Sequence, residues 1–424
     1  MHSYWWFKPH IVTAVWAVPL LLIAALISDE WYREIGGTPK FLDLENLTVC
    51  FFGLLFFIGG AWFGARPFSR FQPIHASSFG LSVPETTYRQ TMYMLLLVTL
   101  VAYVIWLWRY LVDPALIVPI LRGDPLAVYA AKDFAERVPG ITSLVNAAPL
   151  YVLLFALYAK VTGARLKKWD KLAMGLFLFV TVSRVLIYSE RVALVSLAIP
   201  FVLAAFGGAA KRWKLIAVLP VVLAVLLVLL FGIAEYFRSW LNFYVDRSDS
   251  FWGFALSRLV AYYVTASNNG ALMFEEFDPL YMPFYTAAWF WVFPIELVPG
   301  GMRELLNVDV DDYMRLLEVY ANPEFNNWGM FSPFVDFGII GGMIFWGVLG
   351  WVSGRLYHGF TKGTAFGLLL YPCWYTGVLE IPRGLTFGGT PFFVLFVVTL
   401  GVIWMFSRNR SSAALGSVIQ TKRW

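Results

Sequence analysis

Two apolar runs meet in the segment VTVSRVLIYSERVALVSLAIP, residues 180–200, which carries the charged residues Arg184, Glu190 and Arg191. A charge in the hydrocarbon interior costs about 2.5–3.5 kcal/mol even on insertion scales, so it persists where it meets a cavity, a partner or a charged ligand. Seven residues separate the two arginines, which places them on one face of a continuous helix. They are candidates for binding an anionic headgroup. The alternative is an ion pair, with Glu190 or a loop carboxylate, that holds a helix end.

The composition is that of a protein embedded in a membrane. Of 424 residues, 59% are hydrophobic and only 14% are charged, whereas soluble domains carry about 25% charged residues. The two cysteines lie in apolar runs and do not suggest a disulfide framework or a metal site. No nucleotide-binding glycine loop and no metal-ligand spacing appears. We therefore expect no cofactor, no metal ion and no nucleic-acid partner.

Ten apolar segments are candidate spans, since crossing the hydrocarbon core needs about 17–25 residues. Counts of nine to eleven are defensible, and ten is the number for which lysine and arginine gather in every second loop. This predicts an all-α polytopic membrane protein with both termini on the cytoplasmic side, and the first segment is expected to remain as a signal anchor. The segments are 11–28, 46–64, 91–111, 141–159, 172–188, 191–207, 214–234, 331–352, 364–378 and 390–407.

The predicted organisation has three parts. Residues 1–234 hold spans one to seven, with a short hairpin at 112–140 on the outer surface. Residues 235–330 form one long outer loop with amphipathic and re-entrant segments. Residues 331–424 hold the last three spans and a cytoplasmic tail. Loops of this length are usually functional, so we expect the functional site there.

Several outer segments each bring an arginine to the same depth, and this convergence is the main functional signal. Besides the first pair, they contain Arg258, Arg383 and Arg303. An amphipathic interfacial helix with anchoring tyrosines would explain the surroundings of Arg258 equally well. The carboxylates near this depth are Asp336 and Glu380. The polar and aromatic side chains nearby are Tyr262, Tyr263, Asn268, Asn269, Asn322, Asn326 and Asn327.

Three stretches together resemble the Wzy-type O-antigen and oligosaccharide repeat-unit polymerases, over roughly residues 172–405. They are the SR…SER element, YYVTASNNGA in the long loop, and NPEFNNWGMFSPFVDFGIIGG after it. The resemblance implies a GT-C-like glycosyltransferase of the bacterial inner (cytoplasmic) membrane that needs no metal ion. It implies undecaprenyl-diphosphate-linked oligosaccharides as donor and acceptor, joined at the periplasmic face, with membrane lipids and a chain-length regulator as further partners. By this resemblance Arg191 matches the arginine after the short span, Asp336 the carboxylate of D-F-G-x-x-G, and Asn322 and Asn326 the polar residues before it.

On this hypothesis Arg191 and Arg184 bind the donor diphosphate, and Arg258 or Arg383 completes the clamp. Asp336 or Glu380 acts as general base, and a part for Glu190 in the chemistry stays open. Tyr262, Tyr263, Trp289 and Trp291 would contact sugar or lipid, and Asn268, Asn322 and Asn326 would bind sugar.

Three alternatives remain: a flippase for the same lipid-linked oligosaccharide, an O-antigen ligase, and an accessory subunit of an export machine. The related ligases rely on a histidine in the long outer loop, and residues 235–330 contain none. A transporter would need charge along a route across the bilayer, whereas the cytoplasmic halves of the predicted spans look apolar.

Overall fold

The computed structural model describes residues 4–66, 83–122, 124, 127, 138, 140–188, 191–207, 213–236, 240, 250–292, 301–310, 313–320 and 327–421. In these residues the chain is helical, apart from one isolated bridge between Gly329 and Gly384. The long helices are α1 (Pro9–Leu26), α3 (Leu44–Ala65), α4 (Glu85–Trp106), α8 (Ala148–Thr162), α9 (Lys168–Tyr188), α10 (Arg191–Phe206), α11 (Trp213–Glu235), α12 (Phe251–Glu276), α16 (Ser332–Lys362), α17 (Ala365–Glu380) and α18 (Thr390–Thr421). The short ones are α2 (Asp29–Trp31), α5 (Trp108–Val112), α6 (Ile117–Leu121), η5 (Thr142–Ala147), η7 (Tyr285–Ala287), α13 (Ala288–Trp291), α14 (Gly301–Leu305) and α15 (Tyr313–Tyr320).

The protein is a helical membrane protein. Seven described helical segments are long and apolar enough to cross a bilayer: α1, α3, α4, the η5–α8 segment, α9, α16 and the first 19 residues of α18. Helices α10 and α11 are also apolar, with shorter uninterrupted runs. Large apolar side chains point outward along these helices, including Leu97, Phe179 and Ile340 at 64%, 70% and 77% exposure. Such side chains are stable on the outside only where lipid tails cover them.

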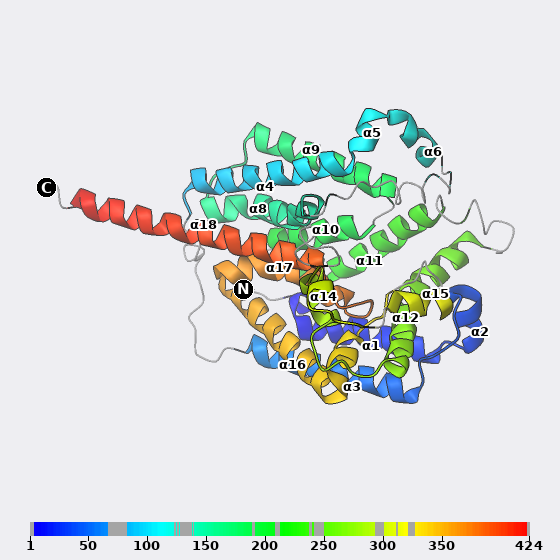
Figure 1. The fold of residues 1–424 in the computed structure, drawn as a ribbon. Helices are drawn as coiled ribbons and strands as arrows, with labels where there is room; N and C mark the ends of the chain where they lie inside the picture. Colours follow the sequence, from blue (N-terminus) through cyan, green and yellow to red (C-terminus); the bar gives the residue numbers. More distant parts are fainter. Residues whose placement is uncertain are drawn as a thin grey trace.

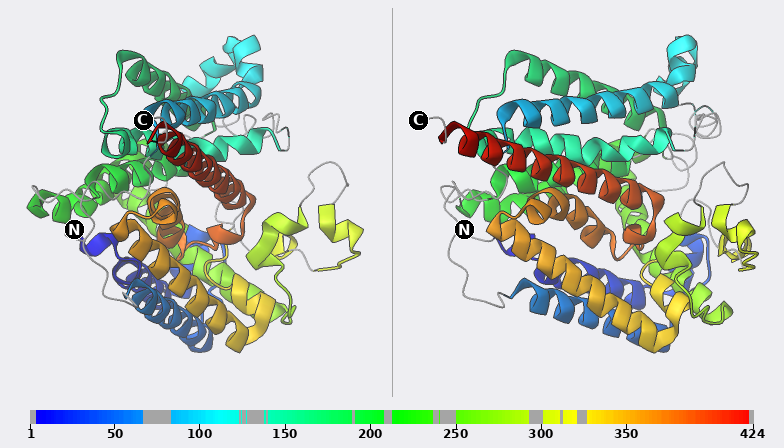
Figure 2. Two further views of the ribbon diagram at one scale, coloured as in Figure 1. Left: turned by 90° about the vertical axis from the view of Figure 1, so that its left-hand side faces the viewer. Right: turned by 60° about the vertical axis from the view of Figure 1, so that its left-hand side comes forward.

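The helices run alternately in opposite directions, and the molecule has two distinct ends (Figure 1). We call the end where α1 begins and α18 finishes the basic end. The other, which carries α2, α5, α6 and α15, is the loop end, and the right-hand view of Figure 2 also separates it from the basic end. Each of the ten segments predicted as spans is helical over most of its length, although 91–111 covers parts of α4 and α5, and 141–159 covers η5 and most of α8.

Helix α17 lies at the centre and joins two groups of helices. It packs against α1 and α16 on one side and against α8, α10 and α18 on the other. Most of its side chains are buried, from Gly367 to Glu380. Because protein surrounds it, α17 can be short, with 16 residues, and still contribute its C-terminal end to the interior of the loop end.

Helices α3 and α16 approach each other very closely, because glycines on each face the backbone of the other. A Cβ atom at Gly350 would lie 2.1 Å from the carbonyl oxygen of Phe57, and one at Gly60 would lie 2.1 Å from that of Gly347. Small residues at such crossings let two helix backbones meet inside a membrane. The glycines of α16 therefore pack closely against α3.

The long outer loop contains a feature that the sequence did not reveal. Residues 251–276 form α12, which packs against α1, α11 and α16 instead of lying on the surface. Its polar residues Arg258, Thr265, Asn268 and Asn269 are all buried. The alternative of a purely interfacial helix is therefore wrong for this face of α12. In the predicted hairpin 112–140 the structure describes α5, η4 (Pro114–Leu116) and α6, and of the predicted re-entrant segment it describes η7 and α13.

Candidate functional site

Arg258 forms a buried ion pair with Glu235, the last residue of α11. The distance between Arg258 Nε and Glu235 Oε2 is 3.0 Å, and the two side chains are only 5% and 2% exposed. One helical turn away, the rings of Phe231 and Tyr262 lie 6.4 Å apart. The pairs 231–262 and 235–258 are successive levels of one antiparallel contact between α11 and α12. The ion pair therefore fixes α11 to α12 at the loop end.

Arg383 follows the end of α17 and faces the same stretch of α12. Its Nη1 lies 3.1 Å from Glu380 Oε2, and its guanidinium carbon is 4.1 Å from the centre of the Tyr262 ring. With the Asn327 amide oxygen turned toward Arg383, that oxygen accepts hydrogen bonds from Nε and Nη2 at 3.2 Å each. The Arg383 side chain remains 19% exposed. It is thus held on several sides while part of it stays accessible.

These contacts bring together a site that we call the paired-arginine site. It contains the Arg258–Glu235 ion pair between α12 and α11 and the Arg383–Glu380 ion pair at the end of α17, whose arginine packs on the Tyr262 ring of α12. Residues Arg258 and Tyr262 are four apart and so share a helix face. Among the described residues, no group of three or more His, Cys, Asp or Glu side chains is arranged to hold a metal ion. The members of the site are Glu235, Arg258, Tyr262, Asn327, Glu380 and Arg383.

The backbone around Arg383 is fixed to the same segment. Gly329 N donates a hydrogen bond of 3.0 Å to the Arg383 carbonyl, and Asn269 Nδ2 donates one of 3.0 Å to the Asn327 carbonyl. Gly329 adopts a φ of 60° beside the backbone of Ala266, which favours glycine at this position. The segment before α16 is therefore clamped between α12 and the α17–α18 connection.

Asp336 has a different environment, because its carboxylate anchors the preceding loop. It is 0% exposed and accepts hydrogen bonds from Tyr285 N, Thr286 N and Thr286 Oγ1 at 3.0, 2.7 and 2.6 Å. Two residues later, α16 is interrupted at Gly338, whose φ is 69°. The described partners of this carboxylate are groups of the protein itself: the Thr286 hydroxyl and two backbone N–H donors. We therefore assign the general-base role in the proposal below to Glu380.

We predict that Asp336→Asn destabilises the fold by about 1–3 kcal/mol, the cost of an unmatched buried polar group. An asparagine NH₂ group would replace one carboxylate oxygen and face a backbone N–H donor, Tyr285 N or Thr286 N, from which it cannot accept. The thermal unfolding temperature in detergent measures this, and Thr286→Val, which removes one hydrogen bond, is the smaller matched change. A transfer activity that disappears while the unfolding temperature stays constant would instead make Asp336 the base.

Arg184 belongs to a second group of helices. Its guanidinium carbon lies 4.0 Å from the centre of the Trp106 ring and 5.7 Å from that of Tyr103, both on α4. Arg191 is the first residue of α10, and its side chain lies outside the description, as does all of Glu190. In Figure 1, α9 and α11 end and α10 begins at the loop end. The common depth of the arginines and a shared diphosphate clamp stay predictions.

The remaining predicted residues have mostly internal partners. Asn268 Oδ1 accepts from Phe41 N and Leu42 N, and its Nδ2 donates to the Pro39 carbonyl, so its amide ties α12 to the segment before α3. Tyr263 packs on Trp16. Asn322 and Asn326 lie outside the described residues. The other aromatic and basic candidates also have defined partners: Trp289 stacks on Phe393, Trp291 Nε1 donates to the Pro283 carbonyl, and Arg303 donates to the carbonyls of Val308 and Val310.

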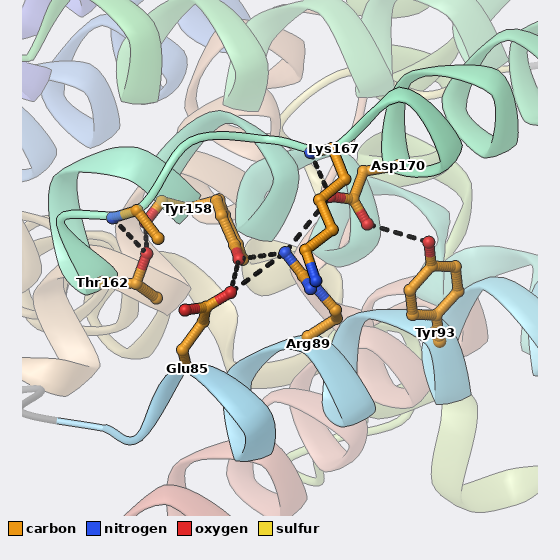
Figure 3. Close-up of polar contacts among 8 residues, drawn as sticks. Glu85, Arg89, Tyr93, Tyr158, Thr162, Lys167 and Asp170 are labelled. Carbon is orange, nitrogen blue, oxygen red and sulfur yellow. Dashed lines mark hydrogen bonds and ion pairs between the residues drawn. The ribbon is translucent and has the colours of Figure 1, made fainter.

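A second polar cluster lies at the basic end, where the sequence looked apolar (Figure 3). Asp170 is 1% exposed, accepts hydrogen bonds from Tyr93 OH and Lys167 N at 2.8 and 2.7 Å, and lies 3.5 Å from Arg89 Nη2. The same guanidinium nitrogen donates to Tyr158 OH at 2.6 Å and lies 3.1 Å from Glu85 Oε1. This corrects the expectation that intramembrane charge gathers at one face alone.

Two members of these clusters show what the sequence could have revealed. Glu235 was overlooked because it comes directly after an apolar run, where a carboxylate is normally solvated. A buried arginine needs a counter-charge. Burial of Arg258 would therefore have implied a carboxylate nearby, and Glu235 is that carboxylate. Asp170 and Arg89 lie just outside the predicted spans 172–188 and 91–111, and each lies within the first two turns of a helix.

Comparison of the chain with protein-family models, with curated proteins and with solved structures gives no match.

Proposed function

We propose that the protein is a membrane glycosyltransferase of the bacterial inner membrane that polymerises undecaprenyl-diphosphate-linked oligosaccharide repeat units at the loop end. The observation that carries the proposal is Arg383, a partly exposed guanidinium held over an aromatic ring beside a carboxylate. Guanidinium groups bind phosphate oxygens in bidentate fashion, and Tyr262 offers a flat surface next to it. The resemblance of residues 172–405 to Wzy-type polymerases supports the same reaction.

In the proposed reaction, a hydroxyl oxygen of the acceptor sugar attacks the anomeric carbon of the donor. The bond from that carbon to the diphosphate breaks, and undecaprenyl diphosphate leaves with the bonding electrons. Arg383 stabilises the negative charge that develops on the leaving oxygen. Glu380, 3.1 Å from Arg383, takes the hydroxyl proton. Binding of the diphosphate would compete with Glu380 for the guanidinium, which leaves the carboxylate able to accept that proton.

The proposal includes ten membrane crossings, with the basic end in the cytoplasm and the loop end in the periplasm. Helix α17 and the two shorter apolar helices α10 and α11 then join the seven longer segments as spans. Lysine and arginine concentrate on the cytoplasmic side of membrane proteins, and the basic end carries them in excess. Those whose side chains the structure describes there are Lys8, Arg66, Arg89, Lys160, Arg165, Lys167, Lys168, Lys171, Arg355, Lys362 and Arg408, against Glu85 and Asp170.

We predict that Arg383→Ala lowers the rate of polymer formation about a hundredfold or more, as loss of one preorganised donor to a developing oxyanion does. The assay mixes purified protein with lipid-linked repeat units and follows the ladder of products on a gel. Arg383→Lys keeps the charge and loses the bidentate geometry, so its rate of polymer formation should lie between those of wild type and Arg383→Ala. Arg303→Ala is the matched control, because its guanidinium donates to carbonyls of its own loop. Ladders of equal length from wild type and Arg383→Ala would refute the arginine role.

Transport of the same lipid-linked oligosaccharide is the second candidate, and one observation favours it. Buried charge occurs at both ends of the helix bundle, because the cluster at Arg89 and Asp170 lies opposite the paired-arginine site. A transporter should move a labelled lipid-linked oligosaccharide across a proteoliposome membrane without lengthening it. The polymerase should lengthen it even in detergent, where no second compartment exists.

A further inference from the structure

The connection between α8 and α9 carries a concentration of exposed positive charge. Helix α8 ends at Thr162 with Gly163 in the left-handed region, and α9 begins at Lys168. Five exposed side chains follow in this short stretch, one of them a tryptophan that is 70% exposed. We call this the α8–α9 basic surface. Its members are Arg165, Lys167, Lys168, Trp169 and Lys171.

The acidic residue of this stretch is turned away from the surface. Figure 3 shows Asp170 directed into the interior, toward Tyr93 on α4 and toward Arg89. Its hydrogen bond from Lys167 N also folds the connection back over the start of α9. The neighbouring Glu85 side chain, 44% exposed, is paired with Arg89. The four positive charges of the α8–α9 basic surface therefore face outward without a carboxylate among them.

Exposed tryptophans show that this surface lies where the apolar bundle meets water. Trp62 on α3 and Trp404 on α18 are 48% and 60% exposed. The Arg66 and Arg408 guanidinium carbons lie 3.2 and 5.5 Å from the centres of these two rings. Tryptophan is enriched at the level of the lipid headgroups. The end of α3, the start of α9 and the later part of α18 all lie toward the basic end in Figure 1, so Trp169 lies near the same level.

We propose that the α8–α9 basic surface binds the phosphodiester headgroups of anionic phospholipids in the leaflet at the basic end. Lysine and arginine next to a membrane span attract anionic lipids, with an effect of about fivefold in affinity for each charge. Arginine adds bidentate contacts to phosphate oxygens, and the exposed indole of Trp169 occupies the interface beside them. The inference does not depend on the proposed glycosyl transfer or on which way the protein is inserted.

The test removes charge from this surface and compares lipid retention. The variant Arg165→Gln/Lys167→Gln/Lys168→Gln and the wild-type full chain are placed in nanodiscs of phosphatidylcholine with increasing phosphatidylglycerol. Native mass spectrometry then counts the phosphatidylglycerol molecules that stay bound. We expect the variant to need more phosphatidylglycerol for equal occupancy, by about fivefold for each charge removed. The control Lys8→Gln/Arg355→Gln/Lys362→Gln removes the same net charge at the same end from side chains that are half-buried, and it should lose less lipid than the first variant.

Further measurements distinguish lipid binding at this surface from changes in stability and from binding of free phosphate. Asp170→Asn should retain at least as much phosphatidylglycerol, since it removes a negative charge, even though it lowers the unfolding temperature. Inorganic phosphate at physiological ionic strength should not displace the lipid. Three results would each overturn the proposal: equal lipid retention by the first variant and wild type, equal loss in the control, or displacement by free phosphate.

Discussion

Replacing Gly350 by alanine is expected to destabilise the helix bundle by about 1–3 kcal/mol or more, the usual cost of overpacking a well-packed contact. The added methyl group would lie 2.1 Å from the Phe57 carbonyl oxygen and 2.9 Å from its carbonyl carbon. Both are backbone atoms, which cannot rotate away as a side chain does. The variant can fold only if α3 and α16 separate, and their separation opens the largest helix contact in the molecule.

Gly347, almost one turn earlier on α16, provides the matched control. A Cβ atom there has its nearest neighbour at 3.5 Å, which is ordinary van der Waals contact. Gly347→Ala should therefore keep or raise stability, because alanine favours a helix over glycine by up to about 1 kcal/mol. The unfolding temperatures of both variants in the same detergent measure the difference. Equal temperatures for the two would show that the close approach of α3 and α16 is not required.

Arg258→Met is expected to destabilise the protein by about 3–5 kcal/mol, because it leaves Glu235 charged and buried without its partner. The Glu235 side chain is 2% exposed, and solvent cannot replace the guanidinium. The double variant Arg258→Met/Glu235→Leu should recover most of that loss, since apolar residues of similar volume often replace a buried ion pair at little cost. Thermal unfolding of the wild type, both single variants and the double variant gives the coupling energy.

The same double variant decides whether Arg258 binds substrate. If Arg258 acts by holding α11 against α12, polymer formation should return together with stability. If its guanidinium contacts the diphosphate, the double variant should fold normally and remain inactive. The first outcome makes Arg258 a positioning residue. The second makes it a substrate-binding residue, the role proposed for Arg383.

The sequence predicted the helices well and their partners poorly, for a physical reason. Apolar length and the positions of lysine and arginine depend on the local chain, so the ten predicted spans correspond to helices that begin within a few residues of the expected positions, apart from α4 and α8. The neighbours of a polar side chain depend on contacts between distant segments. Asp336 meets Thr286, 50 residues away, and Asn268 meets Phe41, 227 residues away. No local pattern contains that information.

The contacts of the candidate site also divide into local ones, which the sequence can predict, and long-range ones, which it cannot. Glu380 and Arg383 are three residues apart, and their pairing needs no knowledge of the fold beyond the end of a helix. The pairing of Arg258 with Glu235 needs the antiparallel contact of α11 with α12, which was hidden because α12 was expected in a surface loop. The cluster around Asp170 depends on three helices meeting at the basic end.

Hydrogen bonds join α17 to the first described residues, so the helix bundle cannot be completed before α17 has been synthesised. Tyr371 OH donates to the Phe7 carbonyl and Tyr375 OH to that of Trp6, so the segment that contains Trp6 and Phe7 binds one that is synthesised 364 residues later. At about 5–20 residues per second, translation takes roughly 20–70 s to reach that partner. During this time α1 lies in the membrane without the helix that completes its packing. Assembly of the bundle around α17 is therefore a late step of biosynthesis, and a chain truncated before residue 365 lacks the centre of the fold.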